Sequence, residues 1–120
     1  MSDSIKVFGN VGSPYTQKIL ALLRYRNISY TVSWGDVVQN LSLLDIDPPK
    51  PVLLPTMVFS NGDNKKIAKT DTTPIIRELE DIYENKSVIP LLPVLNFLNY
   101  LLEDFVDEWT TKYMFHYRWH

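Results

Sequence analysis

The 120-residue sequence contains no cysteine. Without cysteine the chain can form no disulfide, exchange no electrons through a thiol and bind no metal ion through a thiolate. Disulfides are typical of oxidising compartments, and the sequence does not open with a signal peptide. We therefore expect a cytoplasmic protein.

An excess of one charge is also missing, because 12 basic residues stand against 14 acidic ones. With no basic stripe to attract a phosphate backbone or an anionic bilayer, we expect neither nucleic acid nor membrane as a partner. The longest apolar stretch, residues 88–102, is broken by Pro90, Pro93, Asn96 and Asn99. Such a stretch does not suit a membrane-spanning helix, which needs about 20 apolar residues.

What the sequence does have is enough apolar residues for a core. Hydrophobic residues make up 45% and charged residues 22%, which are ordinary values for a globular protein and far from those of disordered chains. A chain of this length buries roughly two-thirds of the surface that its unfolded form exposes.

The first third of the sequence predicts a β-α-β unit. Residues 5–9 are a β-branched and aromatic run that ends at a glycine, as a buried strand does. Ser13 can cap a helix with Pro14 at its first position and an apolar face further on. Residues 29–33 then predict a second strand, parallel to the first if the helix is a crossover. A short helix is expected at residues 37–44.

The middle of the sequence predicts a hairpin and another helix. Residues 56–59 and 65–69 flank the turn signal Asn-Gly-Asp-Asn at 61–64, which favours two antiparallel strands. Residues 70–74 supply hydroxyl and carboxylate caps and a first-turn proline, and apolar residues follow at helical spacing. The predicted α/β fold therefore has the order β-α-β-α-β-β-α within residues 1–88.

From residue 92 the pattern changes to apolar residues every three or four positions, which predicts one long helix over 92–120. Its aromatic residues would form a sticky patch if nothing covered them. His116 and His120 are four apart and could share a metal ion, but without a third ligand a solvated pair is favoured, so no metal is expected.

Three features together resemble the thioredoxin-like N-terminal domain of the glutathione transferases: the order of the elements, a proline opening the third strand, and a capped polar turn before the next helix. Related glutaredoxins carry Cys-Pro-Tyr-Cys where this chain has Ser13-Pro14-Tyr15-Thr16. Hydroxyls at both cysteine positions exclude glutaredoxin-type exchange, which needs a mixed disulfide. Residues 103–119 (EDFVDEWTTKYMFHYRW) are similar to a segment of bacterial members, so residues 92–120 resemble the first helix of a truncated all-helical domain.

The resemblance implies glutathione as co-substrate and a hydrophobic electrophile as the second substrate. In a serine-type transferase, Ser13 would be the catalytic hydroxyl that donates to the glutathione sulfur. The backbone of Leu54, beside a cis Pro55, would pair with the cysteinyl group. Asp71 and Thr72 would bind the γ-glutamyl group, facing its ammonium and its carboxylate respectively.

Plainer roles are open for the same residues. Ser13 could merely cap its helix, Asp71 could belong to an ordinary capped turn, and Pro55 could be trans, as most prolines are. Tyr15 is a second hydroxyl that could replace Ser13, although packing against the helix is favoured.

The sequence departs from the family in one place. Members often have a basic residue shortly before the cis proline, near the glycyl carboxylate, where this chain has Val52 and Leu53; Lys50 lies further upstream. The glycyl end of glutathione is therefore without an expected partner.

Two classes of function follow. The chain is either a glutathione transferase, which could be inactive as so short a chain, or a non-catalytic thioredoxin-fold binding or assembly module that docks through its aromatic C-terminal helix. A homodimer is expected, because an orphan apolar helix is most simply buried against its own copy.

Overall fold

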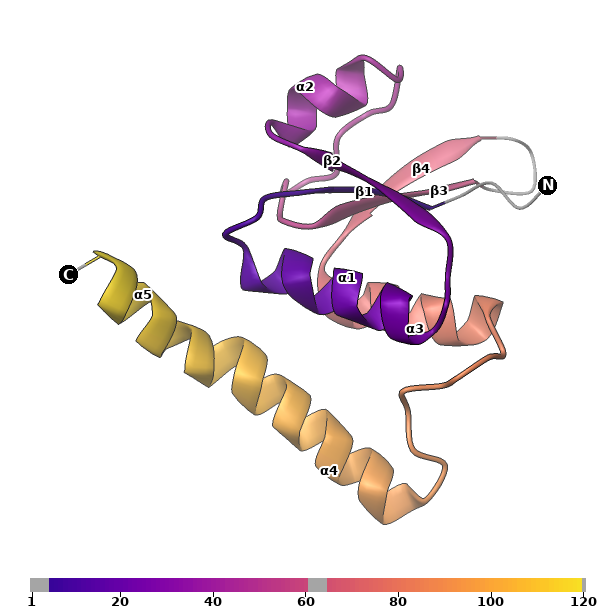
Figure 1. Cartoon of the computed structure of the whole chain (residues 1–120), viewed down its shortest axis with the longest axis vertical. Coiled ribbons are helices and arrows are strands. Elements are labelled where there is room, and N and C mark those ends of the chain that lie inside the picture. The colour runs from indigo at the N-terminus through magenta and orange to yellow at the C-terminus, as the bar shows by residue number, and fades with distance from the viewer. Residues whose placement is uncertain (1–4, 61–64, 120) are drawn as a thin grey trace. The chain divides into compact units, whose positions relative to one another are not determined.

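Four strands form one mixed sheet in the order β2-β1-β3-β4 (Figure 1). This computed structural model describes residues 5–60 and 65–119 of the chain. Strand β1 pairs with β2 in parallel and with β3 antiparallel, and β3 pairs antiparallel with β4. The strands are β1 (Ile5–Gly9), β2 (Tyr30–Trp34), β3 (Thr56–Ser60) and β4 (Lys66–Thr70).

Three helices cover the two faces of this sheet: α1 (Pro14–Tyr25), α2 (Val37–Ser42) and α3 (Thr72–Ile82). Helices α1 and α3 lie together on one face, and α2 lies on the other (Figure 1). Because side chains alternate along a strand, Val7 and Phe8 serve different faces. Phe8 packs in the cluster of α2 with Val37, Leu41, Ile46 and Val58. The buried side chains of α1 and α3 include Ile19, Leu20, Leu23, Ile75, Ile76 and Leu79.

The observed order confirms the predicted β-α-β-α-β-β-α fold, with shifts of one or two residues at the ends of elements. Helix α2 ends at Ser42 and not at residue 44, because Asp45 adopts a positive φ of 55° and Ile46 N–H donates to the Leu41 carbonyl at 3.1 Å. This is the usual way in which a left-handed residue closes a helix. The expected turn at residues 61–64 lies outside the described residues.

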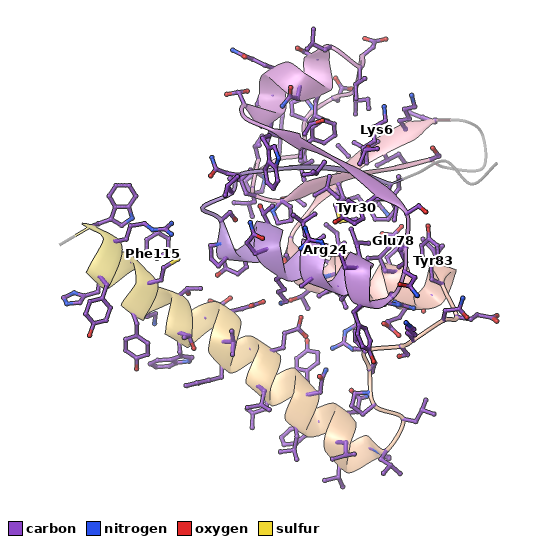
Figure 2. The ribbon with its side chains drawn as sticks, viewed as in Figure 1. Lys6, Arg24, Tyr30, Glu78, Tyr83 and Phe115 are labelled. Atoms are coloured by element: carbon purple, nitrogen blue, oxygen red, sulfur yellow. The ribbon has the colours of Figure 1, made fainter. Side chains whose placement is uncertain are left out.

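Arg26, at the C-terminal end of α1, is buried although arginine is usually exposed. Its guanidinium donates to Glu80 Oε1 at 2.7 Å, to the Asn85 carbonyl at 3.1 Å and to the carbonyl of Tyr83, which is labelled in Figure 2. These bonds join the end of α1 to α3 and to the segment after it. The burial is therefore compensated by an ion pair and two backbone acceptors.

Residues 87–120 form a separate unit from residues 1–86. Its described part is helical from α4 (Pro93–Asp104) through a π-helical segment η1 (Phe105–Thr110) to α5 (Thr111–Trp119). The predicted long helix is confirmed, but its π-helical segment was not predicted. Thr111 Oγ1 donates to the Asp107 carbonyl at 2.8 Å, and such hydroxyl bonds compete with the helical ladder.

None of the described residues of α4, η1 and α5 is buried. Within the parts of the chain that the structure describes, no helix combines the length and the hydropathy that a membrane crossing requires.

Candidate functional site

Three loops leave the sheet at the same end. Phe8, near the end of β1, pairs with Thr56 at the start of β3, and Thr56 pairs with Thr70 at the end of β4. The segment after β1, the segment before β3 and the segment after β4 therefore start beside one another. These segments carry the predicted site residues Ser13, Leu54, Pro55, Asp71 and Thr72.

Ser13 is the N-cap of α1, as predicted. Its backbone is extended, with φ −84° and ψ 118°, and its Oγ accepts a hydrogen bond from Thr16 N–H at 3.2 Å. A serine hydroxyl has two acceptor lone pairs and one O–H donor, and the cap occupies only a lone pair. The capping role is therefore compatible with donation to a second atom at the helix N-terminus, where the helix dipole favours an anion.

Thr16, at the second of the two cysteine positions of glutaredoxins, is completely buried. Its Oγ1 accepts from Asn10 N–H at 3.4 Å, and its side chain lies over Gly9. A Cβ at Gly9 would lie 2.5 Å from Thr16 Cγ2, so the close approach of α1 to β1 requires a glycine there. Thr16 therefore fastens α1 to the sheet, while only Ser13 of the two hydroxyls is partly exposed at the helix start.

The Leu54–Pro55 peptide bond is cis, as the family resemblance implied, and not trans. Pro55 is buried, and Leu54 is half-buried. The carbonyl of Leu53 accepts from two hydroxyls of the sheet, Thr56 Oγ1 at 2.9 Å and Thr70 Oγ1 at 3.0 Å. These threonines, which sequence reasoning did not single out, hold the loop against β3 and β4.

Asp71 combines a capping role with an unusual backbone. Its carboxylate accepts from Thr73 N–H at 3.2 Å and caps α3, while its φ is 76° and its ψ 120°. This ψ lies outside the small left-handed region that aspartate tolerates. Backbone conformations of this kind cost about 1–3 kcal/mol and cluster at functional sites. The next residue, Thr72, is only 3% exposed.

Lys18 is a residue that sequence reasoning missed. It lies on α1, is half-buried, and its Nζ donates to Thr72 Oγ1 at 3.4 Å. The bond connects α1 to the start of α3 across 54 positions of sequence. No local pattern could have revealed it, since only the packing of the two helices brings the residues together.

The segment before Pro55 has no basic side chain between residues 51 and 54. Val52 and Leu53 are 40% and 48% exposed, and Lys50 is exposed. Among the described residues, no group of three or more histidine, aspartate or glutamate side chains is arranged to hold a metal ion. His120, one of the two histidines considered above, lies outside those residues.

Comparisons with known proteins bear on the family and the fold of this chain. A family model described as the N-terminal domain of glutathione S-transferase matches residues 7–87. Among solved structures, a glutathione transferase homologue from Burkholderia, with bound glutathione, superposes with a TM-score of 0.66 at 14% identity. The match covers 88% of this chain and 55% of that one, so the chain spans about half the homologue's length. At this identity the likeness establishes the fold alone. No curated protein sequence matches.

Proposed function

The chain belongs to the glutathione S-transferase family through its N-terminal domain, and from that premise we propose that it binds glutathione and activates the glutathione thiol. The thiol gives its proton to solvent, and the thiolate attacks an electrophilic carbon of a hydrophobic substrate such as an aryl halide. A carbon–sulfur bond forms, the carbon–halogen bond breaks and halide leaves with its electron pair, so no covalent enzyme intermediate is needed. The proposed site occupies the end of the sheet where the three loops converge, within residues 1–88.

In this proposal the γ-glutamyl group binds at the N-terminus of α3. The Asp71 carboxylate faces its ammonium, and the Thr72 hydroxyl and the first-turn N–H groups bind its carboxylate. Two observations support this assignment: the strained backbone of Asp71 and the burial of Thr72 at the start of an 11-residue helix. A threonine that accepts from Lys18 still has its O–H to donate.

The cysteinyl group pairs with the backbone N–H and C=O of Leu54, as an added strand pairs with a sheet edge. Support comes from the two threonine hydroxyls that fix the neighbouring Leu53 carbonyl. A loop held in this way keeps its backbone groups in one orientation, so little conformational entropy is lost when the ligand binds.

The observation that carries the proposed chemistry is the hydrogen-bonding state of Ser13. Because its Oγ accepts from Thr16 N–H, the oxygen is held at the helix start while the O–H can donate to the glutathione sulfur. The dipole of the 12-residue helix α1 adds positive potential at the same place. Both effects stabilise the thiolate over the thiol and lower the pKa of the bound thiol.

Residues 92–120 are proposed to be the first helix of an all-helical domain that contributes to the electrophile site. We also propose that the chain works as a homodimer in the cytoplasm, where glutathione is kept reduced. Light scattering at micromolar concentration checks the dimer, and a monomer would contradict it.

A second candidate is a non-catalytic module that docks through its aromatic C-terminal helix. It is favoured by the exposure of aromatic side chains along that helix, all of them at least half exposed: Phe97, Tyr100, Phe105, Trp109, Tyr113, Phe115, Tyr117 and Trp119. Large exposed apolar surfaces of this kind mark protein interaction sites.

Isothermal titration of the full chain with glutathione, followed by a conjugation assay with an aryl halide, separates the two candidates. We expect saturable binding that Thr72→Ala abolishes, and we expect Ser13→Ala to bind glutathione but to lose conjugation. Ser29→Ala, in an exposed loop between α1 and β2, is the matched control and should behave like the wild type. No heat at millimolar glutathione would refute the transferase proposal; binding without conjugation by the wild type would favour the docking module.

A further inference from the structure

The side chain of Lys18 reaches from α1 to the hydroxyl proposed to bind the γ-glutamyl carboxylate. Lys18 lies five positions after Ser13 on the same helix, and its Nζ is 3.4 Å from Thr72 Oγ1. The ammonium of Lys18 therefore lies beside Thr72, the first residue of α3, which follows Asp71 in the sequence.

The bond between Lys18 and Thr72 is a weak one for an ammonium group. At 3.4 Å it is longer than an ordinary N–H···O hydrogen bond, and its acceptor is a neutral hydroxyl. A carboxylate is a better acceptor for the ammonium, because the attraction between opposite charges adds to the hydrogen bond. Lysine has three donors, and the bond to Thr72 uses one of them.

From this geometry we propose that Lys18 binds the α-carboxylate of the γ-glutamyl group together with Thr72. The inference rests on the proposed glutathione site and extends it to a residue outside the three loops. With Asp71 facing the ammonium of the ligand and Lys18 facing its carboxylate, the site recognises a zwitterionic amino-acid end by two opposite charges. Lys18 thereby makes the site selective for γ-glutamyl peptides over ligands that lack this carboxylate.

The test uses two ligands that differ by that carboxylate alone. Glutathione is compared with 4-aminobutyryl-cysteinylglycine, which keeps the amine and lacks the α-carboxylate, by isothermal titration of the full chain. The variants are Lys18→Met, which keeps the length of the side chain, and Lys18→Arg, which keeps its charge. Lys65→Met, at an exposed position before β4, is the control. Thermal unfolding of each variant checks that the fold is intact.

We expect Lys18→Met to weaken glutathione binding about tenfold, or about 1.4 kcal/mol, and to leave binding of the analogue unchanged. Lys18→Arg and Lys65→Met should keep most of the affinity for glutathione. If both ligands bound equally more weakly, Lys18 would stabilise the fold or contact another part of the ligand. If glutathione binding were unchanged, Lys18 would have no role in binding. Either result overturns this inference while the glutathione site stands. Absence of glutathione binding by the wild type would overturn the proposed function itself.

Discussion

Replacement of Asp71 by glycine should make the protein more stable and its glutathione binding weaker. Glycine adopts a φ of 76° without the steric cost that a Cβ brings, and that cost is about 1–3 kcal/mol. Two losses of stability partly offset this gain. The weaker helix cap costs a few tenths of a kcal/mol, and the greater freedom of glycine in the unfolded chain costs about 0.4–1 kcal/mol. The free energy of unfolding should therefore rise by about 1 kcal/mol.

Two further variants at Asp71 separate the strain from the charge. Asn keeps the cap and the strain, so Asp71→Asn should leave stability within about 0.5 kcal/mol of the wild type and still weaken glutathione binding. Ala keeps the strain and loses the cap, so Asp71→Ala should cost about 1 kcal/mol. The expected order of stability is Gly, then Asp and Asn together, then Ala.

Urea unfolding followed by circular dichroism measures this order, because the midpoint shifts with stability at a constant slope. In thermal unfolding, 1 kcal/mol corresponds to roughly 4 °C for a chain of this size. A glycine variant less stable than the wild type would refute the argument that the backbone of Asp71 is strained. If the asparagine variant kept the wild-type affinity for glutathione, the Asp71 carboxylate would not be a partner of the ligand's ammonium group.

Two other predictions concern the fold that supports the site. Arg26→Met removes a buried guanidinium from the half-buried Glu80 carboxylate and from the carbonyls of Tyr83 and Asn85, so it should lower the free energy of unfolding by about 3–5 kcal/mol. Arg24→Met removes only an exposed bond to the Tyr30 hydroxyl, labelled beside it in Figure 2, and should change that free energy by less than about 0.5 kcal/mol. Equal effects of the two variants in urea unfolding would contradict this. Gly9→Ala should lower the free energy of unfolding by about 1–3 kcal/mol, because the added methyl group clashes with Thr16. The double variant Gly9→Ala/Thr16→Ala should lose less stability than the two single variants added together. Additive losses would show that the two side chains do not meet.

The order of elements could be predicted because most of its signals are local. Serine and proline at positions 13 and 14 favour a helix start, because one caps the helix and the other suits its first position. The β-branched and aromatic residues at 5–9 favour a strand whatever lies around them. The predicted end of α2, residue 44, lies two residues beyond the observed end at Ser42, because the chain closes the helix there with the i→i−3 bonds of Leu44 and Asp45, which the apolar spacing does not reveal.

The parts of the site that depend on distant contacts could not be predicted. Lys18 meets Thr72, and Arg26 meets Glu80, only after α1 and α3 have packed, and each pair is 54 positions apart. The strain at Asp71 is a property of the junction between β4 and α3, and the residue type alone does not reveal it. The sequence offers Ser13 as either a cap or a donor, but a hydroxyl that accepts the bond from Thr16 N–H keeps its own O–H to donate, so the two roles are compatible.

The most direct test of the proposed chemistry is a pH titration of glutathione bound to the full chain, in which the absorbance of the thiolate reports the pKa of the bound thiol. We expect the bound thiol to ionise at lower pH than that of glutathione in solution, and Ser13→Ala to return its pKa toward the solution value while glutathione stays bound. A hydrogen bond to a charged group is worth about 1.5–3 kcal/mol, so the thiolate fraction at neutral pH should fall roughly tenfold or more in the variant. Identical titrations of wild type and Ser13→Ala, both matching glutathione in solution, would contradict the account and leave Ser13 as a helix cap alone.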